Sequence, residues 1–211
     1  MTGMTAWVGL NLAEVKAGDI IFISGAAGAV GSVAGQLAKL RGCRVIGSAG
    51  SMEKVMFLRE ECGFDIAFDY KIGPVLEQLK VEAPDGIDVY FDNVGGETLE
   101  AALSALRMHG RIIACGSISN YNAEKPRPGP SNLFNMITKR LTMKGLLVRD
   151  WLDRQDEFEN EVGGYFKAGK LKSKETVVKG IEQAVGAFLG LFEGRNVGKM
   201  VVELALSRAA S

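Results

Sequence analysis

The fold of this chain is decided by the stretch Asp19-Ile20-Ile21-Phe22-Ile23-Ser24-Gly25-Ala26-Ala27-Gly28-Ala29-Val30-Gly31. Its first part is a short, mostly apolar and β-branched run, which predicts a strand covered on both faces and ending at Gly25. After the glycine turn, apolar residues recur at helical spacing, namely Val30, Val33, Ala34, Leu37 and Ala38. The sequence therefore predicts a strand, a glycine turn and an amphipathic helix in direct succession.

The same alternation continues along the chain. Further strands are expected at residues 44–47, 66–68, 87–91, 111–115 and 141–148, with helices between them at 51–61, 74–83, 99–106 and 133–139. Because right-handed crossovers lay each helix back on the sheet, this pattern predicts an α/β fold. We expect a doubly wound Rossmann sheet of six parallel strands in the order 3-2-1-4-5-6, with ligands bound at the switch point between strands one and four.

The two ends of the chain fit this sheet less well. A helix is expected over residues 5–12, and two amphipathic helices (around 158–166 and 181–192) and a last strand (199–204) come after the sixth strand. We therefore expect a Rossmann domain over residues 1–170 and a separate C-terminal segment over residues 171–211. The proline-rich stretch 123–130 is expected to be an extended loop at the ligand edge.

Composition excludes several classes of protein. The 211 residues are 47% hydrophobic and 24% charged, which is typical of a globular domain with a sizeable core. The 25 Lys and Arg balance the 25 Asp and Glu, so no electrostatic footprint for nucleic acid is expected. No stretch approaches the roughly 20 apolar residues that cross a bilayer, and the first residues lack a secretory signal. We therefore expect a cytoplasmic protein with neither a nucleic-acid nor a membrane partner.

The first turn has the spacing of a dinucleotide-binding fingerprint. Ala26, Gly28 and Gly31 fall on the positions of G-x-G-x-x-G, with alanine at the first of them. Gly28 would let the backbone approach a pyrophosphate, and the N–H groups of Ala29 and Val30 would lie at the positive end of the helix. A tight turn without a ligand is the alternative. Dinucleotide binding is favoured because the glycine motif lies after a first strand and before a long helix.

The choice of nicotinamide cofactor depends on the residues after the second strand. A carboxylate there would bind the ribose 2′-hydroxyl of NAD and repel a 2′-phosphate, but residues 47–51 contain no acid. Lys54, one turn into the next helix, supplies a positive charge, and Tyr70, at the end of the third strand, could cover the phosphate. NADP(H) is therefore favoured. The alternative for Lys54 is an ordinary lysine on a helix, whose ammonium group is solvated and binds no phosphate.

The chain shows neither a metal motif nor a nucleophile motif. The three cysteines are widely spaced and are expected to be reduced thiols, and neither an HxxxH pattern nor a G-x-S-x-G elbow is present. His109 is the only histidine, and we expect it to be a surface residue in a helix-to-strand turn. No metal site is therefore expected, and the chemistry is assigned to the cofactor.

Two polar stretches should converge on the switch point. Asn93 follows the fourth strand and is expected to meet the nicotinamide half of the cofactor. Residues 115–122 follow the fifth strand, where Gly116 permits close approach and Tyr121 offers a phenol. Because the phenol stays protonated at neutral pH, Tyr121 is the best available donor to a substrate carbonyl. The alternative is that Tyr121 only packs on the proline-rich loop.

These motifs occur together in one known family. Residues 3–6, 26–32, 91–96, 115–122 and 196–199 make the chain resemble the zinc-independent medium-chain dehydrogenase/reductases, and within them the prostaglandin reductase and curcumin reductase group. The resemblance implies an NADPH-dependent reductase of the carbon–carbon double bond in α,β-unsaturated ketones and aldehydes.

The resemblance also assigns site residues by matching motif. It implies pyrophosphate contacts from Gly28, Ala29, Val30 and Gly31, and 2′-phosphate contacts from Lys54 and Tyr70. The ribose and nicotinamide would be held by Asn93, Cys115, Gly116, Ser117, Ile118 and Tyr121. Leu146, Leu147 and Val148 would line the nicotinamide side, and Asn196 would return to the cofactor from the C-terminal end. Tyr121 would be the catalytic residue, close to the ribose hydroxyl and the substrate carbonyl.

The resemblance implies that members of this family begin with a β-rich, GroES-like catalytic domain, which we expect to be missing here, and that residues from about Leu171 match the part that completes it. We therefore expect the cofactor half of a longer enzyme, with exposed apolar faces over residues 181–192 and little enone reduction on its own. The family pairs its edge strand, here 141–148, to form homodimers. Two alternatives stay open: a quinone oxidoreductase of the same superfamily, and a catalytically silent NADP-binding module.

Overall fold

The computed structural model describes residues 1–125 and 128–204. A six-stranded sheet contains β1 (Ile20–Ile23), β2 (Arg44–Ala49), β3 (Ile66–Asp69), β4 (Ile87–Asp92), β5 (Leu106–Ala114) and β6 (Thr142–Gly145). The strand order is β3-β2-β1-β4-β5-β6, and every neighbouring pair is parallel. The predicted Rossmann order 3-2-1-4-5-6 is therefore confirmed.

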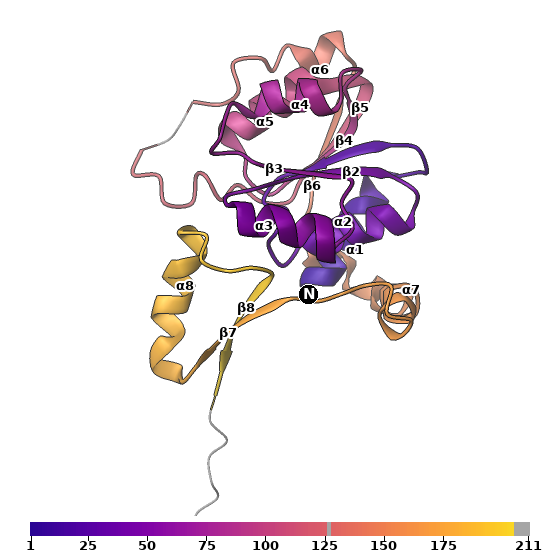
Figure 1. Ribbon diagram of the computed structural model, residues 1–211. Helices are drawn as coiled ribbons and strands as arrows, with labels where there is room; N and C mark the ends of the chain where they lie inside the picture. Colours follow the sequence, from indigo (N-terminus) through magenta and orange to yellow (C-terminus); the bar gives the residue numbers. More distant parts are fainter. Residues whose placement is uncertain (126–127, 205–211) are drawn as a thin grey trace, which may run out of the picture.

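Helices cover both faces of this sheet (Figure 1). One face carries α1 (Thr2–Leu12), α2 (Gly31–Leu40) and α3 (Met52–Met56), and the other carries α4 (Val75–Glu82), α5 (Gly96–Ala105) and α6 (Asn135–Thr138). This arrangement places the helix that follows β1 directly beside the carboxyl end of the central strands.

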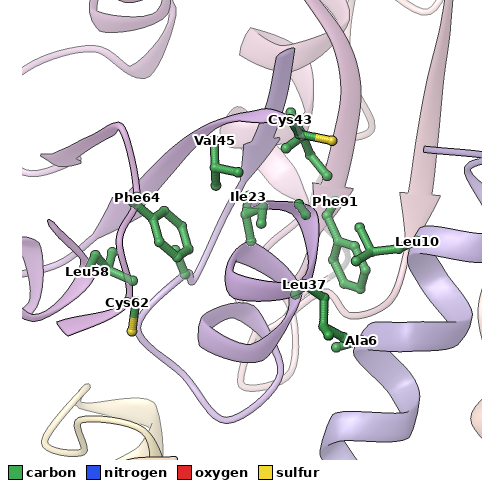
Figure 2. Packing of buried hydrophobic residues seen from close by; sticks show 14 of the residues in the cluster. Ala6, Leu10, Ile23, Leu37, Cys43, Val45, Leu58, Cys62, Phe64 and Phe91 are labelled. Atoms are coloured by element: carbon green, nitrogen blue, oxygen red, sulfur yellow. The ribbon is translucent and has the colours of Figure 1, made fainter. Parts of the chain in front are cut away.

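Each face has its own hydrophobic cluster. Figure 2 shows the cluster between the sheet and α1 and α2, in which Leu10, Leu37 and Phe91 are almost completely buried. On the opposite face, the ring of Phe22 stacks on those of Tyr90 and Phe68, with centroid distances of 5.2 and 5.9 Å. Burial of such side chains contributes about 1.5–3 kcal/mol each to folding. The two clusters hold β1 and β4 from both sides and so fix the ends of these strands.

Several boundaries differ from those expected, and the strand expected over 141–148 is limited to Thr142–Gly145. The helix over 51–61 is divided into α3 and a π-helical turn (Phe57–Glu61), and the helix over 133–139 is reduced to α6. β5 begins at Leu106 instead of residue 111, because Leu106 pairs with Ile87 and leaves the helical pattern of α5. His109 therefore lies within this strand at an irregular point, with a φ of 62° and an exposed side chain.

The rest of the chain lies beyond the sheet. It comprises a 3-10 turn (Val148–Arg154), α7 (Gln155–Lys167), β7 (Glu175–Lys179), a second 3-10 turn (Ile181–Gln183), α8 (Ala184–Phe192) and β8 (Lys199–Glu203). β7 and β8 form a separate parallel pair. No strand was expected at β7, because its sequence Glu-Thr-Val-Val-Lys does not alternate apolar and polar residues. The division of domains at residue 170 stays a prediction.

The apolar face expected on the late helix is present. Ile181, Val185, Phe188 and Leu189 are each more than half exposed.

Within the described ranges 1–125 and 128–204, no helix has the length and apolarity needed to span a membrane. The cytoplasmic location stays a prediction. Of the proline-rich stretch, Pro126 and Arg127 lie outside the described residues.

Candidate functional site

A cavity of about 1290 Å³ lies at the carboxyl ends of β1, β2, β3 and β4. The last residues of β2 and the segments that follow these strands supply much of its lining, including Gly25, Ala27, Gly28, Ala29, Val30, Gly31, Ser48, Ala49, Gly50, Tyr70, Lys71, Asn93, Val94 and Gly95. The cavity therefore occupies the switch point at which the sequence analysis places a ligand.

The turn after β1 is built around its glycines. Gly25 has a φ of 56°, in the left-handed region that favours glycine. A Cβ atom on Gly31 would lie 2.7 Å from both the Gly25 carbonyl oxygen and the Ala26 Cα atom, so only glycine lets α2 begin this close to the turn. Ala29 and Val30 precede α2 and line the cavity. The first N–H groups of a helix have no intrahelical partner, which suits this wall to a phosphate group.

The end of the cavity beside β2 and β3 carries a positive charge. Lys54 lies on α3, whose N-terminus is capped by the Ser51 hydroxyl, and its Nζ donates a hydrogen bond to the Gly194 carbonyl oxygen at 2.7 Å. Burial lowers the pKa of Lys54 below its ordinary value, and the charge of Lys71 lowers it further. A Cβ atom on Gly50 would lie 3.0 Å from the Tyr70 hydroxyl, so Tyr70 packs closely over the end of β2. The Lys54 ammonium is therefore not simply a solvated charge, because it is bonded to the loop after α8.

A buried hydrogen-bond network fixes Asn93. Its side-chain Nδ2 donates to the Ser24 carbonyl oxygen at 2.8 Å, and its main-chain N–H donates to the Ser24 hydroxyl at 3.0 Å. Asp92 is 2% exposed. Its Oδ1 accepts from the Tyr90 hydroxyl at 2.7 Å and from the two main-chain N–H groups after Asn93. Burial, and secondly the charge of Asp92, raises the pKa of Tyr90, so its phenol stays a donor.

Sequence reasoning missed Ser24, Tyr90 and Asp92 as part of the site. The only signal was polar residues at the ends of two otherwise apolar strands. Their network ties the end of β4 to the end of β1, so it sets the position of Asn93 at the cavity wall.

The segment after β5 reaches the cavity only in part. Ile118 and Ser119 line it, whereas Cys115, Gly116, Ser117 and Tyr121 are not among the lining residues. The Tyr121 side chain is 61% exposed, and its hydroxyl oxygen accepts a hydrogen bond from the Ser117 N–H at 3.1 Å. Burial raises the pKa of the Cys115 thiol to about 11, and the charge of Asp92 adds to this effect. Cys115 is therefore a protonated thiol at neutral pH and not a thiolate nucleophile.

Of the site residues predicted from the later part of the chain, some line the cavity and others do not. Leu146, Leu147 and Val148 follow β6 and do not line the cavity; Leu146 packs against the cluster of α1 and Leu147 is 58% exposed. Asn196 does line the cavity, on the loop between α8 and β8. The Gly198 N–H on this loop donates to the Ala27 carbonyl oxygen at 2.8 Å. The loop is therefore bound to the glycine turn and closes one side of the cavity.

Other lining residues were not anticipated. They come from the turn after β3, the start of α4, one side of α5 and the C-terminal end of α8, and include Lys71, Pro74, Leu76, Thr98, Ala101, Phe192 and Glu193. Of these residues, only Lys71 could have been predicted from the sequence, because it is a basic residue next to Tyr70. No cluster of three His, Cys, Asp or Glu side chains that could hold a metal ion occurs among the residues that the structure describes.

Comparison with known proteins gives consistent matches. The family model described as zinc-binding dehydrogenase matches residues 29–163. The NADP(+)-dependent 2-alkenal reductase of Nicotiana tabacum is 48% identical over 96% of this chain and 59% of its own length. Prostaglandin reductase 1 of Mus musculus is 44% identical over 96% of this chain and 62% of its own length.

A solved structure agrees with these relatives. The crystal structure of CurA from Vibrio vulnificus in complex with NADPH matches 98% of this chain and 63% of that chain, with a TM-score of 0.93 and 41% identity. This chain therefore spans about 60% of the length of the relatives it matches. Because the family model covers more than half of the chain, the chain belongs to the zinc-binding dehydrogenase family, close to the alkenal, prostaglandin and curcumin reductases.

Proposed function

We propose that this chain is the NADP(H)-binding part of an oxidoreductase that reduces the carbon–carbon double bond of α,β-unsaturated ketones and aldehydes. The observation that carries the proposal is the cavity at the switch point, which combines a glycine turn, an end of β2 without an acid, and the ammonium of Lys54. The proposal is supported by a relative named as an NADP(+)-dependent 2-alkenal reductase and by a similar crystal structure in complex with NADPH.

The residues present fit a dinucleotide phosphate. A Cβ atom on Gly28 would meet only the Gly25 carbonyl oxygen within 4 Å, and Gly28 lines the cavity together with the residues that precede α2. Gly28, Ala29, Val30 and Gly31 would hold the pyrophosphate, and Lys54 and Tyr70 would hold the 2′-phosphate. Asn196 would contact the cofactor from the loop that is bound to Ala27. Leu146 to Val148 stay predicted contacts of the nicotinamide side.

The bound cofactor would supply the hydride, and the protein would position it and stabilise the product charge. Asn93 and residues 115–118 would hold the nicotinamide half. Since the Tyr121 oxygen already accepts from the Ser117 N–H, the phenolic hydrogen is free to donate to a substrate carbonyl oxygen. Such a bond strengthens as negative charge develops on that oxygen. In this mechanism no side chain acts as a nucleophile.

The first test is the substitution Lys54→Ala. We expect it to weaken NADPH binding on the order of 10-fold and to change NADH binding much less, because only NADPH carries the 2′-phosphate. Isothermal titration calorimetry of both cofactors with both proteins measures the difference. Lys167→Ala, on the exposed side of α7, is the matched control and should change neither affinity. Equal losses for NADPH and NADH would contradict the assignment of Lys54.

We also propose that two copies of the chain pair through β6. This strand lies at the edge of the sheet, and Met143 and Leu147 at this edge are exposed. An unpaired strand edge is a template for pairing, and pairing across a two-fold axis would make one continuous sheet. Light scattering at concentrations well above micromolar should give the mass of two chains. A monomer mass throughout that range would contradict this pairing.

The nature of the substrate needs turnover measurements on a polypeptide with the full length of the relatives. NADPH consumption with a simple enone such as 3-nonen-2-one is the expected result. A preference for quinones over enones would favour a quinone oxidoreductase. Cofactor binding without turnover of either substrate would favour a silent NADP-binding module.

A further inference from the structure

Two lysines share the charged end of the cavity. Lys54 on α3 and Lys71 after β3 both line it, and Lys71 directly follows Tyr70 in the chain. The two ammonium groups repel each other enough to lower the pKa of Lys54, an effect that adds to its burial. Neighbouring like charges are unfavourable unless an anion lies between or beside them. The arrangement is therefore that of an anion subsite with two cations.

The two lysines differ in how their donors are used. The Lys54 ammonium donates to the Gly194 carbonyl oxygen at 2.7 Å, which commits part of its hydrogen-bonding capacity to the loop after α8. Within residues 1–125 and 128–204, the Lys71 ammonium makes neither a hydrogen bond nor an ion pair. Only its main-chain N–H is bonded, to the Asp69 carboxylate at 2.9 Å. Lys71 is therefore the cation with its donors free.

Among the described residues, no carboxylate forms an ion pair with the ammonium of Lys54 or Lys71. Glu193 also lines the cavity, but its carboxylate pairs with Arg195 at 2.5 Å. Glu53, next to Lys54 in the sequence, is exposed, and it opposes the lowering of the Lys54 pKa only as the smallest of three effects. The positive charge of the two lysines is therefore only partly offset within the site.

We propose that Lys71 is a further specificity-determining residue, the second lysine that binds the 2′-phosphate of NADP(H), together with Lys54 and Tyr70. The inference rests on the proposed function and extends it by one residue. A phosphate monoester carries close to two negative charges at pH 7 and three acceptor oxygens, more than one partly committed ammonium satisfies. NADH has a neutral hydroxyl at this position, so Lys71 adds affinity only for the phosphorylated cofactor.

The test is calorimetric titration of Lys71→Ala with two pairs of ligands. The pairs are NADPH with NADH, and adenosine 2′,5′-bisphosphate with 5′-AMP. We expect about 5- to 20-fold weaker binding of the two ligands that carry a 2′-phosphate, since Lys71 is exposed and its charge is partly screened. We expect less than about 2-fold change for the other two. Lys71→Arg should retain most of the affinity, and Lys167→Ala should retain all of it.

The outcomes separate the inference from the proposed function. If the parent chain prefers NADPH while Lys71→Ala leaves that preference unchanged, the role of Lys71 is wrong and the proposed function stands. Equal weakening of NADPH and NADH would also overturn the role of Lys71, because it would show a general effect on the cavity. If the parent chain binds neither cofactor, both the function and the inference are wrong.

Discussion

Gly31→Val is expected to weaken NADPH binding by more than about 100-fold. A Cβ atom on Gly31 would approach the Gly25 carbonyl oxygen and the Ala26 Cα atom to 2.7 Å. Both atoms belong to the backbone of the turn, so the start of α2 must move away from it. The N–H groups of Ala29 and Val30 then no longer converge on a phosphate, and losing several such bonds gives a large effect. Calorimetric titration measures the affinity.

Two further variants separate a binding defect from unfolding. Gly164→Val places a side chain in open space on α7 and should leave NADPH binding unchanged. A Cβ atom on Gly28 would come only to 3.3 Å of the Gly25 carbonyl oxygen, so Gly28→Ala should fold normally and lose about 3- to 10-fold in affinity. Circular dichroism and thermal melting report the fold. A folded Gly31→Val protein with the affinity of the parent chain would show that this turn does not bind the cofactor.

Tyr121→Phe is expected to lower the rate of enone reduction at saturating substrate by roughly 10- to 100-fold, in a polypeptide with the full length of the relatives. The hydroxyl would donate to the developing enolate oxygen, and loss of such a donor is felt mainly in the transition state. The cofactor ribose hydroxyl could share this task, which is why the expected loss stays below that of a sole stabiliser. NADPH affinity should change by less than about 2-fold.

Tyr165→Phe is the matched control, since Tyr165 lies on α7 and does not line the cavity. Its rate should equal that of the parent enzyme. An unchanged rate for Tyr121→Phe would remove Tyr121 from the mechanism. In the 211-residue chain the phenol is largely exposed, so water would compete for the enolate and we expect little or no turnover. Robust enone reduction by this chain alone would contradict that expectation.

The order of the sheet was predictable because buried parallel strands are mostly apolar and alternate regularly with helices. The run ending at Ser24 and the segment over β4 both show this, and both lie at the switch point in the structure. The glycine turn was predictable for a related reason. Gly31 packs against the backbone of residues only five and six positions earlier. The need for glycine at this position can therefore be recognised within one local motif.

Contacts between distant parts of the chain could not be read in this way. β7 is recognisable only through its pairing with β8, and the cavity wall around Asn196 depends on a bond from Gly198 to Ala27. The contact between Lys54 and Gly194 likewise joins segments 140 positions apart in the sequence. Periodicity and turn chemistry are local signals, whereas these contacts depend on how the late elements pack on the finished sheet.

The central claim is that the cavity at the switch point binds NADP(H) in preference to NAD(H). Calorimetric titration of the unmodified chain with NADPH and with NADH tests it most directly. The expected result is one site per chain for NADPH and an affinity at least about 10-fold higher than for NADH, because Lys54 and Tyr70 would contact a phosphate that NADH lacks. Absence of NADPH binding, or equal or tighter binding of NADH, would contradict the claim.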